Sequence, residues 1–336
     1  MRLFKCLVFC CMFFSCHSNK NTPDVSDISI ELSTKRFEKD LFNSDTNHII
    51  ATIDTLISKY PTFGPAFFQT ILNVDPRWND DTTKNYINGF IGSQMAVYDS
   101  AEKIFNDFSP YEKEIRKSLQ YLHYYFPTYV APHEIITYLG PLDGYGDVIT
   151  KDAFLIGLHH HLGKNSSIYN SPWLHETYPQ YLTDRFEPDY IVVNCMKNII
   201  GDMYPDKSEE APLSTQMIEA GKRLYLLQKI IPSYDEYKLI GYTNEQLKKC
   251  YSNESKVWEL FIQNELLHSI DKNLIRNYLG ESPKTQELGE GSPGNIGAFV
   301  GWQIVKKYIQ NFPKTTPGEL MNTDARKILD DAKYKP

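Results

Sequence analysis

The sequence predicts an α+β domain that is predominantly helical, in which a small sheet packs against helices. Apolar side chains recur at helical spacing in the first third of the chain, over residues 37–59, 82–105 and 110–125. Between residues 135 and 158 the period changes to short β-rich runs around the turn-forming stretch GPLDGYG. Beyond residue 181 the helical period returns, and no internal repeat is present. A sheet bracketed in this way by helices indicates one α+β domain rather than a βαβ array.

The individual elements follow from local patterns. Residues 28–32, ISIEL, alternate apolar and polar side chains as a half-buried strand does. Further strands are expected at residues 135–139, 147–149 and 153–158. Later helices are expected at residues 188–200, 213–230, 244–249, 254–264 and 295–310. We expect the sheet to be bordered by long polar loops in which a site can be built.

The first sixteen residues, MRLFKCLVFCCMFFSC, have the pattern of an export signal. Arg2 and Lys5 precede an apolar run over residues 7–14 that is too short to span a bilayer. A small residue before Cys16 and a polar tract after it resemble a bacterial lipobox, although two phenylalanines replace its usual Leu and small residue. We expect residues 1–16 to be a signal peptide with lipid on Cys16, the alternative being an ordinary secretion signal.

Composition sets the domain organisation. Residues 17–27 are rich in Asn, Ser, Thr and Pro and are expected to be a flexible tether. The chain is 41% apolar and 13% aromatic, which is enough for a single domain over residues 28–313, followed by a C-terminal tail at 314–336. The formal net charge is −7, and the sequence has no cluster of basic residues, so it does not indicate nucleic-acid binding.

Two cysteines, Cys195 and Cys250, remain in the body of the chain beyond the four in the N-terminal segment. An exported protein can join them in one disulfide. The alternative is that both are buried as small apolar side chains, and the sequence leaves the choice open.

Three adjacent histidines in LIGLHHHLG, at residues 155–163, raise the question of a metal site. If this stretch is extended, His159 and His161 point to one face of the strand and can chelate a metal. The nearest candidates for a further ligand are His133, His175 and Glu176. The alternative is that one imidazole packs inside with a hydrogen-bonded nitrogen while the others lie at the sheet edge.

Other catalytic motifs are missing from the sequence. The HExxH metal motif fails at both His-Glu pairs, because Thr137 and Pro179 stand where a second histidine is needed. No Gly-x-Ser-x-Gly and no Walker loop occurs. The glycine-rich stretch at residues 289–297 either presents amides to an anion or caps the helix that follows.

The helix expected at residues 295–310 contains two glycines that indicate close packing. Gly297 and Gly301 lie one turn apart in an otherwise apolar segment. Each glycine costs roughly 1 kcal/mol of helix propensity, so we expect a second backbone to approach closely at this face.

Four stretches together resemble the gliding-motility lipoproteins of Bacteroidota called GldB. They are MIEAGKRLYLLQKIIP from Met217, SPGNIGAFVGWQIVKKYI from Ser292, DAFLIGLHHHLG from Asp152 and FEPDYIVVNCMKNI from Phe186. The sequence departs from the family pattern at LHHHLG, where Asp and Tyr are usual, and at Asn295, where Arg is usual.

The resemblance implies a fold similar to that of zincin-type predicted zinc proteases, with a small sheet beside a metal helix. On that comparison the helix from residue 213 is the metal helix, and Ile218 and Lys222, flanking Glu219, occupy the positions of two histidine ligands. Neither an isoleucine nor a lysine cation holds zinc, so the metal helix is degenerate.

The resemblance further implies a lipid-anchored protein of the cell membrane or outer membrane that faces the periplasm. We expect it to be non-catalytic, to need no cofactor, and to act through contacts with other envelope proteins. One alternative is a metal-dependent hydrolase with a site built on His159 and His161. A second alternative is a binding module for a glycan or peptide in a cleft beside the sheet.

Overall fold

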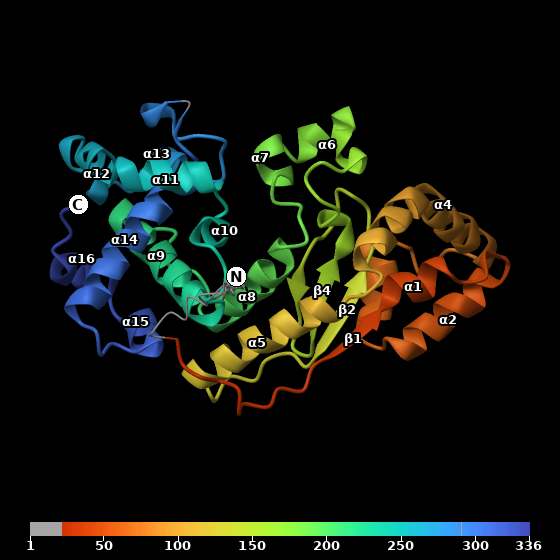
Figure 1. The fold of residues 1–336 in the computed structure, drawn as a ribbon. Helices are drawn as coiled ribbons and strands as arrows, with labels where there is room; N and C mark the ends of the chain where they lie inside the picture. Colours follow the sequence, from red (N-terminus) through yellow and green to blue (C-terminus); the bar gives the residue numbers. More distant parts are fainter. Residues whose placement is uncertain (1–21, 290) are drawn as a thin grey trace, which may run out of the picture.

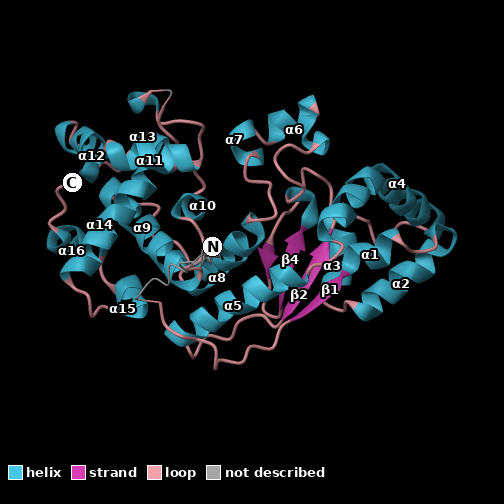
Figure 2. Cartoon of the chain, viewed as in Figure 1, coloured by secondary structure: helices cyan, strands magenta, loops and turns pink. Residues whose placement is uncertain are grey.

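The protein is described here by a computed structural model covering residues 22–289 and 291–336. The expected signal peptide with Cys16, and the first part of the expected tether, lie outside the described residues. The fold is α+β and mostly helical, as the sequence predicts, with one small sheet (Figures 1 and 2). Within the described ranges, no helix is both long and apolar enough to span a membrane.

The sheet has four strands in the order β1-β2-β4-β3. Their bounds are β1 (Ser33–Arg36), β2 (Glu134–Tyr138), β3 (Val148–Ile149) and β4 (Ala153–Gly157). The strands β1, β2 and β4 are parallel, and β3 is an antiparallel edge strand beside β4. The three strands expected between residues 135 and 158 are therefore present, each within one residue of its expected start.

The expected strand at residues 28–32 is wrong, because β1 begins one residue after it. Side chains of α5 (Ser109–Tyr125) take the backbone carbonyls of this segment instead of a neighbouring strand. The Arg116 guanidinium donates to the carbonyl oxygens of Ile30 at 2.6 Å and Leu32 at 2.8 Å, and Gln120 donates to that of Ile28 at 2.7 Å. Alternation alone did not reveal this competition from a helix distant in sequence.

The helical segments between β1 and β2 are α1 (Phe37–Phe42), η1 (Thr46–His48), α2 (Ile49–Lys59), α3 (Phe63–Ala66), η2 (Phe67–Ile71), α4 (Asp80–Phe105) and α5. They lie on two sides of the sheet, with α1, α2 and α4 at one end of the molecule and α5 on the side toward the C-terminal helices (Figure 1). The single helix expected over residues 37–59 is broken between α1 and α2. Asp45 breaks it, because its carboxylate accepts from the Asn47 amide at 2.9 Å and starts a new turn.

A connecting group of helices follows β4 and leads to the C-terminal half. Its members are η3 (Leu158–His160), η4 (Ser167–Asn170), α6 (Pro172–Thr177), α7 (Gln180–Thr183) and α8 (Tyr190–Met203). The helix α8 packs against the edge strand β3 on one side and against α9 on the other. It therefore links the sheet to the C-terminal helices.

The C-terminal half is entirely helical where it is described (Figure 2). It contains α9 (Leu213–Ile230), α10 (Glu236–Ile240), α11 (Asn244–Ser252), α12 (Glu254–Gln263), η5 (Leu266–His268), α13 (Lys272–Leu279), η6 (Gln286–Leu288), α14 (Ile296–Asn311), α15 (Pro317–Asn322) and α16 (Ala325–Ala332). The bounds of α9 are those expected from the apolar spacing.

Both ends of the described chain join the folded body. The segment from residue 314 onward, expected to be a tail, forms α15 and α16, and Leu320 and Ile328 are fully buried. The helix α16 packs against α9 and α14. Val25, within the expected tether, is also buried.

The close approach expected at the glycines of α14 occurs against α9 for Gly301, whereas Gly297 faces the carbonyl oxygen of Tyr278 in α13. A Cβ atom added to Gly301 would lie 1.7 Å from the carbonyl oxygen of Met217, and one added to Gly221 would lie 2.2 Å from the carbonyl carbon of Gly301. The second glycine was not singled out from the sequence. Because only hydrogen atoms separate the two backbones, side chains on either side, such as Trp302, can bury fully.

Candidate functional site

The three adjacent histidines hold a loop in place. The stretch after β4 forms the short helix η3 instead of continuing as a strand, so the expected pairing of His159 and His161 on one strand face does not arise. The ring nitrogens His159 Nε2 and His160 Nε2 lie 3.0 Å from the carbonyl oxygens of Tyr145 and Leu142, in the glycine-rich loop between β2 and β3. The histidines therefore hold that loop against the end of the sheet.

The ring nitrogens of His159 are both used internally. Its Nδ1 accepts a hydrogen bond from the Gly140 amide at 3.2 Å, so its Nε2 carries the proton that is donated to Tyr145. Burial lowers the pKa of His159 well below its ordinary value, and the neighbouring histidines lower it further. A neutral imidazole whose free electron pair already accepts a hydrogen bond offers nothing to a metal.

His161 belongs to a buried ion pair. Its Nε2 lies 2.8 Å from a carboxylate oxygen of Asp147, and its Nδ1 lies 3.0 Å from the Glu187 carbonyl oxygen. Since both neighbours are acceptors, both ring nitrogens donate and the ring is an imidazolium. Burial opposes this charge, but Asp147 outweighs it and raises the pKa of His161.

Asp147 connects this pair to α8. The Asn194 side chain donates to its carboxylate at 2.8 Å, and the Asn198 side chain donates to its backbone carbonyl at 3.0 Å. Burial would raise the pKa of Asp147, but His161 and Asn194 overcome burial and hold that pKa below its ordinary value. Asp147, His161, Asn194 and Asn198 thus form a buried polar cluster between the sheet edge and α8.

The other candidate metal ligands are elsewhere. His133 is exposed just before β2, at the opposite end of the strands from His159. The length of a five-residue strand therefore separates His133 from His159 by roughly 17 Å. His175 is exposed on α6. Among residues 22–289 and 291–336, no three His, Cys, Asp or Glu side chains converge as a metal site.

The residues of the expected degenerate metal helix lie in the core of the C-terminal half. Ile218 is fully buried on α9 where this helix meets α14. The buried ammonium of Lys222 lies 2.6 Å from Glu219 and donates to the backbone carbonyls of Met321 and Thr323 at 3.1 and 3.0 Å. Lys222 therefore caps the end of α15, and α8 rather than α9 is the helix beside the sheet.

The two cysteines are both free and buried. Burial raises the pKa of Cys195 well above its ordinary value and that of Cys250 to about 12. Neither thiol is activated as a nucleophile.

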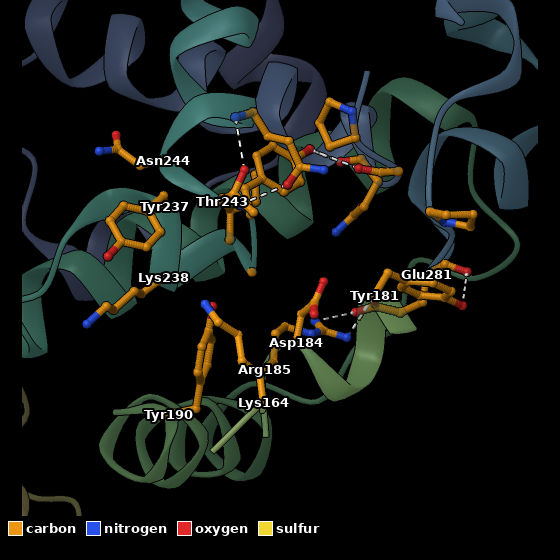
Figure 3. A pocket seen from close by; sticks show the side chains of 18 of the residues that line it. Lys164, Tyr181, Asp184, Arg185, Tyr190, Tyr237, Lys238, Thr243, Asn244 and Glu281 are labelled. Atoms are coloured by element: carbon orange, nitrogen blue, oxygen red, sulfur yellow. Dashed lines mark hydrogen bonds and ion pairs between the residues drawn. The ribbon is translucent and has the colours of Figure 1, made fainter. Parts of the chain in front are cut away.

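A cleft of about 450 Å³ opens between the sheet side and the C-terminal helices. Figure 3 shows Tyr237, Lys238 and Asn244 along one wall, with Tyr181 and Glu281 along the other. The lining combines four tyrosines with three cationic and four carboxylate side chains. Such a mixed lining suits a polar and aromatic surface better than a nucleic acid backbone.

Ion pairs join the two walls of this cleft. Arg185, after α7, binds both carboxylate oxygens of Glu281, at 3.1 and 3.0 Å. Lys238 on α10 lies 2.5 Å from Asp189, at the start of α8. These pairs are partly exposed, so each contributes only about 0–1 kcal/mol.

A model of the family described as gliding motility protein GldB matches residues 18–336. The chain belongs to the GldB family. The match spans the described residues of both the sheet and the C-terminal helices, including α15 and α16. The comparisons with curated proteins and with solved structures each gave no match.

The polar residues that this GldB-family chain places on α8 were not predicted from the sequence. Asn194, Lys197 and Asn198 interrupt the otherwise apolar stretch YIVVNCMKNII at spacings of three and four. That spacing places the three side chains close together on one helix. The interruption of an apolar helix by three neighbouring polar side chains would have predicted a polar site on this helix.

Proposed function

We propose that this chain is a lipid-anchored component of the gliding machinery, held at the cell membrane or outer membrane on its periplasmic side. In this proposal it acts without catalysis, by holding a segment of another envelope protein in the cleft. Membership of a gliding-motility family supports the process. The lipid on Cys16 would supply the membrane attachment.

The observation that carries the non-catalytic part is the saturation of the histidine cluster. His159 has no free electron pair, and His161 is an imidazolium paired with Asp147. A metal would have to displace these buried hydrogen bonds and remove a proton from His161. The arrangement supports a structural role for the histidines and disfavours the alternative of a histidine-based metal hydrolase.

The zincin comparison fits α8 better than α9. In a zincin the helix beside the sheet carries two histidines one turn apart. Here α8 has that neighbourhood, and Asn194 and Asn198 are the residues one turn apart that face Asp147. We infer a protease-like scaffold in which asparagines that bind the loop replace ligands that bind a metal.

The lining of the cleft supports a protein partner. Tyrosine combines a large apolar area with a polar tip and is enriched where proteins meet. Tyr237 lies on α10 along one wall of the cleft (Figure 3), where it is half-buried against the core. An anchor of this kind typically contributes about 2 kcal/mol to binding.

The test compares Tyr237→Ala with Tyr124→Ala in gliding cells. Tyr124 is 52% exposed on α5, away from the cleft, and serves as the matched control. We expect Tyr237→Ala to abolish colony spreading at unchanged protein level, while Tyr124→Ala spreads normally. If both variants spread normally, the cleft does not bind the partner. If the purified protein contains stoichiometric zinc, the alternative of a metal-dependent hydrolase is favoured instead.

A further inference from the structure

A second cavity of about 250 Å³ adjoins the cleft, between α8, α9, α10 and the beginning of α14. Its lining is mostly apolar and includes Ile200, Leu224, Leu227, Leu239, Ile240 and Ala298. It shares Ile240, Glu281 and Asn295 with the cleft, so the two spaces have a common wall. We call it the Lys197 chamber, because Lys197 on α8 is the distinctive charged residue in its lining.

Lys197 has no compensating partner. Among the described residues, neither a hydrogen bond nor an ion pair is found for its ammonium, and the residue is half-buried in the chamber wall. The other two charged residues of the chamber are already compensated. Arg223 is bound by Glu219, and both oxygens of Glu281 are bound by Arg185. The chamber therefore carries one uncompensated positive charge.

The electrostatics of the chamber agree with this geometry. Burial, together with repulsion from Arg185, lowers the pKa of Lys197 to about 8, and attraction from Glu281 only partly opposes this. The backbone of Asn295 adds positive potential, because it begins α14 in the left-handed conformation, at φ 55°, without a side-chain cap. A half-buried cation without a partner is partly desolvated, so an anion that enters the chamber gains a charge-assisted contact.

The walls restrict what that anion can be. Seven of the twelve lining residues have apolar side chains, which favours a ligand with an apolar part over a bare phosphate or sulfate. One uncompensated positive charge matches one negative charge. The volume is below that of an ordinary drug-sized pocket, which limits the apolar part to a short chain or one side chain.

We propose that the Lys197 chamber binds a single carboxylate attached to a short apolar group, with the carboxylate on Lys197 and the apolar group against α9 and α10. A free short-chain carboxylic acid has this chemistry. The C-terminal residue of a peptide lying in the cleft has it too, and only this second source depends on the proposed function.

The test titrates the full-length protein in non-ionic detergent with hexanoate and follows its melting temperature. Hexanol at equal concentration, with ionic strength matched by NaCl, controls for the apolar chain. We expect hexanoate to raise the melting temperature and hexanol to have no comparable effect. Lys197→Met keeps the length of the side chain, and we expect it to weaken hexanoate at least about tenfold. Lys229→Met, at a half-buried lysine of α9 outside the chamber, is the matched control.

The pH dependence in the unaltered protein does not rely on any variant folding. As the pH rises from 7 to 9.5, the protonated fraction of Lys197 falls from about 0.9 to about 0.03, so we expect hexanoate affinity to fall about thirtyfold. The charged groups that face Lys197 from the neighbouring elements are Arg185, Arg223 and Glu281.

Two further ligands separate the sources. Acetyl-Ala-Leu with a free carboxylate is compared with its C-terminal amide. If the free peptide binds at least tenfold tighter than hexanoate, the ligand is a chain terminus, and if the two acids bind equally or hexanoate binds tighter, it is a free acid. The proposal is overturned if neither acid raises the melting temperature, if hexanol equals hexanoate, or if Lys197→Met binds as the unaltered protein does.

Discussion

Replacing Gly301 by alanine tests whether the contact between α9 and α14 holds the C-terminal half together. The added Cβ would lie 1.7 Å from the Met217 carbonyl oxygen, whereas such contacts are essentially never below 3.0 Å. The two helices must therefore separate by at least about 1.3 Å at this point. The Met217 carbonyl oxygen is a main-chain atom, and the position of the added Cβ is fixed by the backbone of α14. Neither atom can therefore move aside as the end of a long side chain can.

The separation has a calculable cost. Overpacking of a well-packed core costs about 1–3 kcal/mol, and a gap of 0.5–1 Å forfeits about a quarter to a half of each dispersion contact that it opens. Alanine returns about 1 kcal/mol of helix propensity. The contact at Gly301 is far below the normal limit, so we take the upper end of the overpacking cost and expect a net loss of about 2 kcal/mol from the free energy of unfolding.

Urea unfolding followed by circular dichroism measures this loss, with Gly89→Ala as control. Gly89 lies in α4, and no atom lies within 4 Å of an added Cβ there, so alanine should stabilise by up to about 1 kcal/mol. Gly221→Ala should destabilise like Gly301→Ala, and the double variant should cost less than the sum because both open the same gap. If Gly301→Ala stays within about 1 kcal/mol of the unaltered protein while Gly89→Ala behaves as expected, the reasoning is refuted.

Three further predictions concern charges and the anchor. Asp147→Asn should destabilise by about 3 kcal/mol at pH 6, because it leaves the buried His161 without its counter-ion. The pKa of His161 is raised on folding, so the contribution of the pair is complete below the ordinary value of about 6.5 and is lost as the pH rises through the higher folded value. The melting temperatures of the unaltered protein and of Asp147→Asn should therefore converge as the pH rises from 6 to 9. A constant difference over this range would contradict the assignment of His161 as an imidazolium paired with Asp147. Lys222→Ala should lower stability by about 2 kcal/mol in urea unfolding, since one buried and one half-buried carbonyl at the end of α15 lose their donor, and an unchanged midpoint would show that water replaces it. Cys16→Ala should move the protein from the membrane to the soluble fraction as an uncleaved precursor, and an unchanged membrane fraction would show that something other than lipid holds it.

Much of the fold could be predicted from local patterns. The apolar spacing gave α9 with its observed bounds and three of the four strands to within one residue. The helix expected over residues 37–59 failed for a local reason at Asp45, and the strand expected at residues 28–32 failed because distant groups compete for its backbone. Arg116 and Gln120 take the carbonyls of residues 28–32 from across the fold, and no pattern within that segment records their presence.

The candidate site divides in the same way. The triple histidine was recognisable as special, but its role depended on which atoms reach the ring nitrogens. Gly140, Tyr145 and Asp147 reach them because the loop after β2 folds back over the end of the sheet. A sequence gives the donors and acceptors of each side chain but not which of them will meet.

What the sequence determined by itself was the fold class, the family resemblance and the need for a close helix contact at Gly301, because each depends on periodicity or residue type along one segment. Only the tertiary structure decided that the histidines are saturated, that Lys222 caps α15 and that Lys197 lacks a partner. These properties depend on burial and on contacts between segments far apart in the chain. Hydrogen bonds and desolvation are set by three-dimensional neighbours, so they exist only once the chain has folded.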